Sequence, residues 1–480
     1  MLRELAPPAP RRTASGGTAR VIGVGLALAL LAGGCSTMTR ARQATAAGVP
    51  CSDTTATDVP QPTPAQLEAA ALGQLPIAPD ADRVDLVAPP FSNPTDVTNP
   101  LFPISDLHSA ILNGHVDGKP FRTETTLLPD TRILQWSDGQ CVEVLVSQYT
   151  AYLDGRLEEV ALDYYAQADD GSVWYFGEDV FNYNAKGHIA DTDGTWLAGK
   201  EGPVAMIMPA DPQVGEVNRP ENIPGLVFEE VAVKSIDQTF DGPSGRVDGA
   251  MVGQELHDDG TFSDKVFVPG YGEFLSAHEG DLEAMALAAP TDAVPGPVPA
   301  GLEAISGGAD RIFESRLSRD RHWRAASKRV SQMVAIWDAF RTGDVPPRLV
   351  APTSRALKRL AARVQVRDRT KTRAAAVDVA YAGIDLQLRY RLPAEIDLAR
   401  FELWTRRVLV HAGADGLAGV TSDVATMEWI RDRFVHTLDA VDVTRIDTLL
   451  GELRTDVVDE DLAAASDTAE ALRELLAGLG

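Results

Sequence analysis

Between residues 101 and 279 the chain repeats one short turn signal, an aspartate followed by a glycine. The pairs are Asp117-Gly118, Asp138-Gly139, Asp154-Gly155, Asp170-Gly171, Asp193-Gly194, Asp241-Gly242, Asp248-Gly249 and Asp259-Gly260. Type I′ turns need positive φ at both central residues, and Asp-Gly meets that need at little steric cost. Such turns join neighbouring antiparallel strands. The repetition therefore favours an antiparallel meander over any parallel arrangement.

The segments between these turns have the composition of strands, because they are rich in β-branched and aromatic residues and often alternate in polarity. The predicted strands cover residues 131–136, 141–149, 157–168, 173–176, 226–236, 247–256 and 265–267. Residues 173–176, Val-Trp-Tyr-Phe, are apolar on both faces of a strand. Either a second sheet or a helical layer must cover the second face. We expect an antiparallel β domain over residues 91–287, built as a sandwich or a curved sheet.

After residue 287 the pattern changes to a helical period. A linker over residues 288–325 begins with a stretch rich in Pro, Ala and Gly. The predicted helices cover residues 326–341, 353–367, 370–389, 393–411, 416–438, 443–454 and 459–476. Pro393 suits a first helical turn, and Gly343 and Gly413 suit helix ends. Short connections predict antiparallel neighbours, so residues 326–480 should form an all-α bundle and the chain an α+β protein.

The N-terminus has the pattern of a lipoprotein export signal. An apolar run of eleven residues, 21–31, is followed by Ala32-Gly33-Gly34 and then Cys35. This run is too short to cross a hydrocarbon core of about 30 Å, and its basic flank and small-residue exit suit a signal peptide over residues 1–34. We expect export, lipidation at Cys35 and an anchor on the extracytoplasmic face of a bacterial membrane.

Residues 35–90 are rich in Ala, Thr, Pro and Asp and show no sustained apolar period. This composition predicts a disordered tether with a short helix near residues 64–75. Cys51 and Cys141 form an even pair in a chain expected to meet an oxidising compartment, so we predict a disulfide between them. The alternative is that Cys141 is a buried free thiol in an apolar strand and that Cys51 has no partner.

The charge is unevenly distributed. Residues 1–300 hold 17 basic and 42 acidic side chains, which accounts for the whole net charge of −25, whereas residues 301–480 hold 27 of each. Within the second part, residues 311–373 are basic, with 17 against 5. This asymmetry predicts that the β domain docks on the basic part of the helical domain, although solvated helix faces would also explain it. A strongly acidic chain is not expected to bind nucleic acid.

Several motifs follow one another in a fixed order. They are Thr98-Asn99-Pro100-Leu101-Phe102-Pro103, Asp163-Tyr164-Tyr165-Ala166-Gln167, residues 170–179 (DGSVWYFGED), residues 206–212 (MIMPADP) and Val268-Pro269-Gly270-Tyr271-Gly272. Residues 91–280 thereby resemble an uncharacterised family of exported bacterial lipoproteins. The resemblance implies an autonomous extracytoplasmic β-rich domain and brings no activity with it. The helical part resembles segments of other uncharacterised lipoproteins.

A hairpin turning at Asp170-Gly171 would place the aromatic and acidic residues on either side of it next to each other. Such a group could line a ligand cleft, since aromatic rings offer area with fixed geometry and the acids offer polar contacts. The candidate ligand-binding residues are Asp163, Tyr165, Trp174, Tyr175, Glu178, Asp179 and Met206. The alternative is plain cross-strand packing.

No nucleophile elbow, phosphate loop or metal-binding motif occurs, so no catalytic residue, metal or cofactor is predicted. His257 and His278 each stand beside carboxylates and are weak candidates for metal ligands. The leading interpretation is a membrane-anchored module that binds a small molecule or an envelope protein. An envelope hydrolase that uses Asp163, Glu178 and Asp211 is the alternative, and a metal-handling helical bundle is a third hypothesis.

Overall fold

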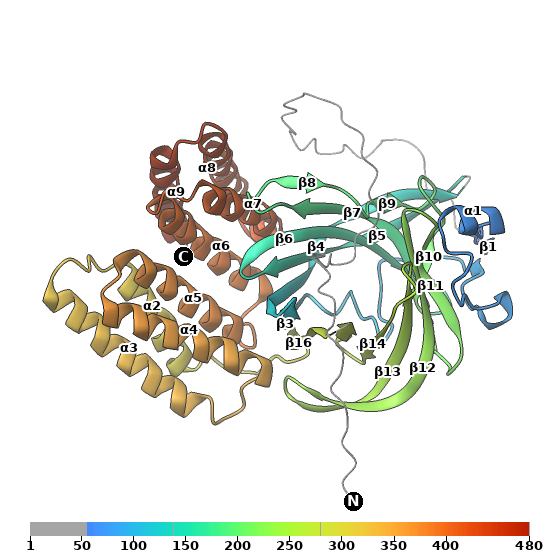
Figure 1. The fold of residues 1–480 in the computed structure, drawn as a ribbon, viewed down its shortest axis with the longest axis horizontal. Helices are drawn as coiled ribbons and strands as arrows, with labels where there is room; N and C mark the ends of the chain where they lie inside the picture. Colours follow the sequence, from blue (N-terminus) through green and yellow to red (C-terminus); the bar gives the residue numbers. More distant parts are fainter. Residues whose placement is uncertain (1–54, 138, 279, 480) are drawn as a thin grey trace, which may run out of the picture.

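A computed structural model describes residues 55–137, 139–278 and 280–479. In it, a large antiparallel β-sheet region is followed by a run of helices (Figure 1). The predicted α+β class and the order of its two parts are therefore confirmed. The predicted signal peptide, Cys35 and Cys51 lie outside the described residues. Among the residues that are described, no helix is long and apolar enough to cross a membrane.

The sheet is built mainly from long strands joined by tight turns. Its strands are β3 (Ser109–Val116), β4 (Lys119–Ser137), β5 (Gln140–Leu153), β6 (Arg156–Gln167), β7 (Val173–Tyr183), β8 (Ile189–Asp191), β9 (Trp196–Leu197), β10 (Ala205–Met208), β11 (Val217–Ile223), β12 (Val227–Gly242), β13 (Gly245–His257), β14 (Phe262–Val268), β15 (Gly272–His278) and β16 (Asp281–Ala289). The strand order is β10-β7-β6-β5-β4-β3-β16-β15-β14-β13-β12-β11, with β8 and β9 also paired to β7. All of these pairings are antiparallel.

Two of the Asp-Gly pairs form the predicted turns, whereas Asp241-Gly242 and Asp248-Gly249 lie within β12 and β13. Asp117 and Gly118, between β3 and β4, have φ of 51° and 70°, and Asp154 and Gly155, between β5 and β6, have φ of 49° and 77°. Positive φ at both central residues matches the twist of the strands that they join. These two hairpins therefore set the register of β3 with β4 and of β5 with β6 locally.

The sheet is a single curved sheet rather than a sandwich. β10 and β11 stand at opposite ends of the strand order, yet the Asn218 side chain on β11 donates a hydrogen bond of 2.9 Å to the Met206 carbonyl on β10. The sheet therefore curls until its two end strands meet, which Figure 1 shows as the green strands facing the teal ones. Curling creates an inner face, directed at the opposite strands, and an outer face.

The part of the predicted tether that the structure describes, residues 55–90, is ordered. It contains β1 (Thr57–Asp58), α1 (Pro64–Ala69), a 3-10 turn (Asp80–Asp82) and β2 (Val87–Ala88). Val59, Leu72 and Ala88 are buried, so this segment packs against the sheet. The expectation of a disordered tether over residues 35–90 is therefore wrong from residue 55 onward, although the short helix within it is confirmed. A Pro-rich segment can still fold when a neighbouring sheet supplies the apolar surface that it lacks.

The helical part begins earlier than the sequence predicts. Its helices are α2 (Ala300–Phe313), α3 (Asp320–Phe340), α4 (Pro347–Val366), α5 (Arg369–Gln387), α6 (Pro393–Ala412), α7 (Leu417–Phe434), α8 (Ala440–Val458) and α9 (Leu462–Ala477), with a 3-10 turn at Val435–Thr437. The prediction that residues 288–325 form a linker is wrong for the part that forms α2. Its buried Leu302, Ile305 and Ile312 follow a helical period that the glycines around them obscure. Pro393 in the first turn and Gly413 at the end of α6 are confirmed.

The outer face of the sheet is covered by the helices. Tyr152 of β5 stacks on Trp404 of α6 with ring centroids 5.9 Å apart, and Trp429 of α7 donates its indole N–H to the Tyr183 hydroxyl at 2.8 Å. Ile111 and Val160 of the sheet belong to the same apolar core as the helices. The helical layer is thus what covers the second face of these apolar strands.

A buried group of charges fixes this contact. Glu124 of β4, which is fully buried, accepts hydrogen bonds from Arg433 Nη1 at 2.6 Å and Arg122 Nη2 at 2.8 Å. Arg122 also forms an ion pair of 2.8 Å with Asp385 of α5, and Arg400 of α6 forms one of 3.0 Å with the same carboxylate. Together these arginines hold the pKa of Glu124 well below its usual range, against the opposing effect of burial.

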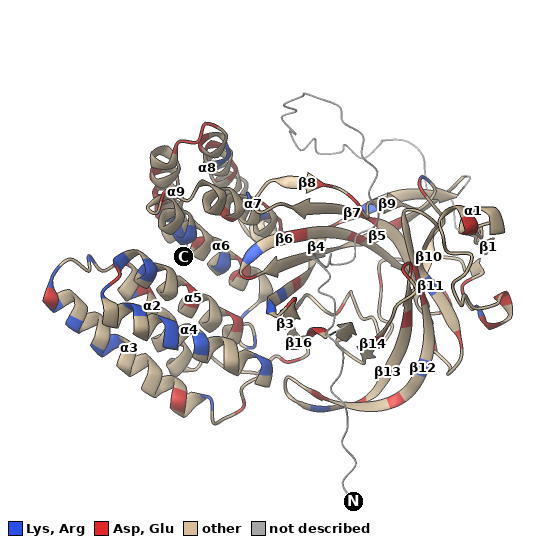
Figure 2. Cartoon of the chain, viewed as in Figure 1, with Lys and Arg blue, Asp and Glu red and all other residues tan. Residues whose placement is uncertain are grey.

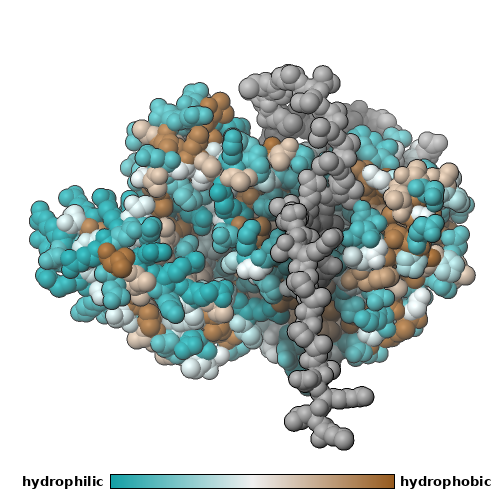
Figure 3. Space-filling view, viewed as in Figure 1, coloured by the Kyte–Doolittle hydropathy of each residue, from teal (hydrophilic) through white to brown (hydrophobic). Residues whose placement is uncertain are grey.

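The ion pairs across this contact use residues beyond the basic stretch 311–373. Most basic side chains of α3 and α4 are exposed, and Figure 2 shows them along these helices. The visible surface over the same helices is largely hydrophilic in Figure 3. Docking between the sheet and the helices is therefore achieved mainly by buried apolar contacts and the Glu124 group, and the basic surface of α3 and α4 faces solvent.

Candidate functional site: an acidic inner face

The hairpin between β6 and β7 brings together four of the seven predicted ligand-binding residues. Asp163 lies opposite Glu178, and Tyr165 lies opposite Tyr175, so all four side chains are on the inner face. The register shifts between these two pairs, at Gly177, which has φ of 107°. A side chain at this position would lie 2.1 Å from the Trp196 carbonyl oxygen, so glycine is required for this bulge.

Contacts on this hairpin separate the predicted residues into two groups. The Tyr175 hydroxyl donates to Asp163 Oδ1 at 2.8 Å, and the rings of Tyr165 and Tyr175 stack with centroids 4.9 Å apart. Trp174, Asp179 and Met206 lie on the other face. The prediction that they share a cleft with Asp163 and Glu178 is wrong, because side chains alternate along a strand and these three point to the opposite face.

The residues on the other face have structural roles. Trp174 is fully buried and donates its indole N–H to Ser172 Oγ at 2.8 Å. Asp179 accepts a hydrogen bond of 2.6 Å from Tyr164 and forms an ion pair of 2.9 Å with Arg132. Asp211 is exposed in the loop after β10 and does not join Asp163 and Glu178. Of the three acids that the hydrolase hypothesis uses, only Asp163 and Glu178 therefore lie together.

More acids join this pair from strands far away in the sheet order. Carboxyl side chains from seven strands gather on the inner face: Glu159 and Asp163 (β6), Glu178 (β7), Glu221 (β11), Glu229 (β12), Glu255 (β13), Glu273 (β15) and Glu283 (β16). Glu178 and Glu221 share a hydrogen bond between their carboxyl groups, although β7 and β11 are not neighbours in the sheet. The curl of the sheet is what brings these groups together. We call this set the inner acidic cluster.

Burial makes several of these acids hard to ionise. It raises the pKa of Asp163 to about 7, even though the hydrogen bond from Tyr175 acts in the opposite direction. It also raises the pKa of Glu159 to about 7, and the neighbouring negative charges of Glu158 and Glu221 add to the effect. The pKa of Glu178 is raised well above its usual range by burial and by the charges of Glu221 and Asp163. Near neutral pH the cluster therefore keeps part of its protons.

Solvent still reaches part of the cluster. Glu159, Glu178, Glu221 and Glu283 are only half-buried, while burial is the main cause of their raised pKa values. Side chains that are surrounded by protein and yet touch solvent must line a concave surface. These four carboxyl groups of the inner face are therefore in contact with solvent.

One end of the inner face is apolar instead. Phe102, in the segment before β3, packs against Tyr165 with centroids 5.0 Å apart and against Phe267 with centroids 6.4 Å apart. Asn99 holds this segment in place, because its side-chain amide donates to the carbonyls of Gly171 and Pro209, both at 3.0 Å. The motif around Asn99 and Phe102 therefore closes one end of the curl, next to the tyrosines.

A chain of polar contacts runs along β13 and β14 at the acidic end. Lys265 Nζ lies 2.8 Å from Glu255 Oε1, Ser263 donates to Glu255 Oε2 at 3.0 Å, and His257 Nε2 lies 2.9 Å from Ser263 Oγ. Although burial opposes it, Lys265 lowers the pKa of Glu255 to about 2, so this acid is ionised. The carboxylate contacts the serine rather than the far nitrogen of the imidazole, so this group does not have the order of a Ser-His-acid triad.

Sequence reasoning missed most of the inner acidic cluster. Glu159 and Asp163 stand four residues apart in one strand, and Glu255 and His257 stand two apart in another, so each pair shares a face. Charged residues at alternate positions of otherwise apolar strands could have signalled a polar inner face. The sequence does not reveal which strands oppose each other across the curl.

A separate groove lies outside the curl, between the N-terminal segment and the sheet. Its volume is about 630 Å³, and Gln61, Trp136, Lys200 and Asn222 are among the residues that line it. None of the predicted site residues borders it. It mixes polar and apolar side chains without the concentration of one charge that marks the inner face.

Comparisons with known proteins add no assignment. No protein-family model matches the chain, and no curated protein is significantly similar to it. The resemblance of residues 91–280 to exported lipoproteins therefore stays a prediction.

The Cys51–Cys141 disulfide also stays a prediction. Cys141 lies near the start of β5, while Cys51 is outside the described residues. Next to Cys141, the Gln140 side chain donates to Thr57 Oγ1 at 2.8 Å and accepts from the backbone N–H of Thr55 at 3.3 Å. The chain that follows Cys51 therefore runs beside Cys141, which favours the predicted pairing.

Proposed function

We propose that this protein is an exported, lipid-anchored binding protein whose curved sheet holds a positively charged organic molecule on its inner face. The observation that carries the proposal is the inner acidic cluster, in which carboxyl groups from seven strands face one another. Bringing like charges together in a buried place is costly unless they are protonated or neutralised. A bound cation would neutralise them.

The surroundings of the cluster favour an amine attached to an apolar body. The rings of Tyr165 and Tyr175 lie beside Asp163, and aromatic faces attract ammonium groups. The apolar end at Phe102 and Phe267 would take the rest of the molecule. A ligand with one charged and one apolar end would thus match the two ends of the inner face.

The test is isothermal titration of the full-length chain in detergent with phenethylamine, spermidine and choline, with EDTA present throughout. We expect phenethylamine to bind more tightly at pH 8 than at pH 6, with release of protons, because the acids must ionise to hold it. Asp163→Asn should weaken binding about tenfold, the cost of one charged contact. The matched control Asp211→Asn, at an exposed position, should bind like the unchanged chain.

Two results would contradict the proposal. One is an absence of heat with all three amines at both pH values, and the other is equal affinity in Asp163→Asn and the unchanged chain. A binding heat that does not depend on pH would argue against the acids as the contact. In that case the groove beside Trp136 would become the better candidate.

An envelope hydrolase is the second candidate, and the pair Glu178 and Glu221 favours it. Two carboxyls that share a proton are suited to general acid and base work. Turnover of chromogenic glycosides by the unchanged chain, abolished in Glu178→Gln, would support this activity over simple binding.

A further inference from the structure

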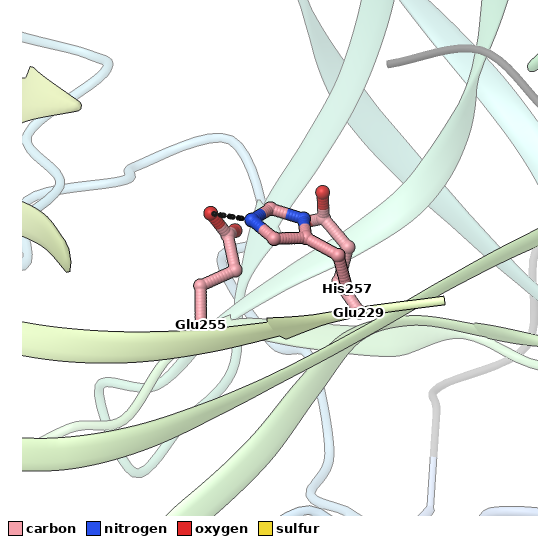
Figure 4. A group of neighbouring side chains, drawn as sticks. All are labelled: Glu229, Glu255 and His257. Atoms are coloured by element: carbon pink, nitrogen blue, oxygen red, sulfur yellow. Dashed lines mark ion pairs between the residues drawn. The ribbon is translucent and has the colours of Figure 1, made fainter. Parts of the chain in front are cut away.

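We propose that Glu229, Glu255 and His257 form a binding site for a divalent transition metal such as Zn²⁺, at the β12–β13 corner of the inner face. One ligand atom each from Glu229, Glu255 and His257 lie within 4.8 Å of one another, and Figure 4 shows the imidazole between the two carboxylates. The site goes beyond the proposed function, because it needs no organic ligand.

The strand register brings these side chains together. Glu229 of β12 lies directly opposite His257 of β13, which places their Cβ atoms about 5 Å apart. The ring of His278, at the end of β15, lies 5.1 Å from that of His257, centroid to centroid. Two carboxyl groups and an imidazole from β12 and β13 thus meet at one place, with the ring of His278 beside them.

The hydrogen bonds around His257 indicate which of its nitrogens is free. Glu255 is ion-paired with Lys265, so its carboxylate only accepts hydrogen bonds, and Ser263 donates its single hydrogen to it. Ser263 Oγ must then accept from His257 Nε2–H, at 2.9 Å. This tautomer leaves the lone pair of His257 on Nδ1.

That lone pair is buried and unused. His257 is 6% exposed, and its Nδ1 has no hydrogen-bond partner among the residues that the structure describes. The same is true of His278 Nδ1 within the described chain. Buried polar atoms without partners are uncommon in proteins and call for an explanation. A metal ion bound at His257 Nδ1 would provide one for this residue.

The donor types and their support match a transition metal. Imidazole nitrogen with carboxylate oxygen suits Zn²⁺ and similar ions, whereas Ca²⁺ and Mg²⁺ prefer oxygen alone. Metal-binding histidines usually donate their other N–H to an oriented acceptor, as His257 does to Ser263. The positive charge of Lys265 is already offset by Glu255, whose Oε1 lies 2.8 Å from the lysine Nζ.

The experiment is equilibrium dialysis of the EDTA-treated full-length chain against ZnCl₂, followed by measurement of bound zinc, with no amine present. We expect one equivalent of zinc, and Co²⁺ in its place should give visible absorption bands typical of nitrogen and oxygen ligands. His257→Ala should lower the affinity at least about 100-fold, and Ser263→Ala, which removes only the positioning contact, about tenfold. His188→Ala, at an exposed edge position, is the matched control and should bind normally.

Zinc that binds equally to His257→Ala and the control, or no stoichiometric zinc at all, would overturn the proposal. If His257→Ala fails to fold by circular dichroism, Glu229→Gln decides the question by the same measurement. Amine binding is measured in EDTA and zinc binding without amines, so failure of one proposal is distinguishable from failure of the other.

Discussion

At the scale of single residues, the inner acidic cluster has an energetic consequence. Asp163 has a pKa of about 7 in the folded chain, while an unfolded aspartate has about 3.9. Between these values the folded state holds a proton that the unfolded state releases, so stability falls as the pH rises through this window. The charged and titratable groups facing Asp163 are Tyr149, Glu159, Tyr165, Tyr175, Glu178, Glu221 and Glu273. All of the acids among them increase the cost of its charge.

The prediction at this scale concerns Asp163→Asn. The free energy of unfolding of the unchanged chain should fall between pH 5 and pH 7.5, and that of the variant should fall less. At pH 7.5 the variant should therefore be more stable than the unchanged chain by about 1–3 kcal/mol. Urea unfolding at the two pH values measures both quantities. Asp211→Asn should follow the unchanged chain, and an identical pH dependence in Asp163→Asn would show that Asp163 is ionised freely in the fold.

At the scale of elements, the contact between the sheet and helices α5 to α7 depends on charges that sequence reasoning did not single out. Glu124 is surrounded by Arg122, Arg400 and Arg433, and Tyr381 also donates to it at 2.8 Å. A buried ion pair is costly to break, because the partner left behind has neither water nor a counter-ion. The group therefore makes the docking specific, while the stacked Tyr152 and Trp404 supply apolar contact.

Glu124→Gln tests this contact. The substitution keeps the shape of the side chain and removes the charge, so the free energy of unfolding should fall by about 3–5 kcal/mol. Chemical denaturation followed by tryptophan fluorescence reports it, since Trp404 and Trp429 lie at the contact. Glu143→Gln, an exposed acid on β5, should change stability by less than about 0.5 kcal/mol. Equal stability of the two variants would show that the buried charges are dispensable.

At the scale of the whole molecule, the described part is one curved sheet with a helical layer on its outer face, preceded by the predicted anchor. We expect the full-length chain to enter the detergent phase of a Triton X-114 separation, because acyl chains on Cys35 would carry it there. Cys35→Ser should remain in the aqueous phase, and Cys51→Ser should behave like the unchanged chain. Cys35→Ser in the detergent phase would rule out lipidation as the anchor.

The sequence by itself determined the local structure. Asp-Gly turns, alternating strands and a helical period from residue 326 were enough for the α+β class, and the turn at Asp170-Gly171 correctly placed Asp163 beside Glu178. These features depend on neighbours within a few residues or on the next strand. The helix α2 escaped prediction, because its glycines masked a short apolar period.

Only the tertiary structure decided which residues form the site. Buried side chains lie on both faces of β6 and β7, so alternation could not distinguish the inner acids from Asp179 and Trp174 on the other face. Glu221, Glu229 and His257 lie on strands at the far end of the sheet order, and only its curl brings them to Asp163. Closure of a sheet depends on the summed twist and bulges of all its strands, which no local pattern encodes.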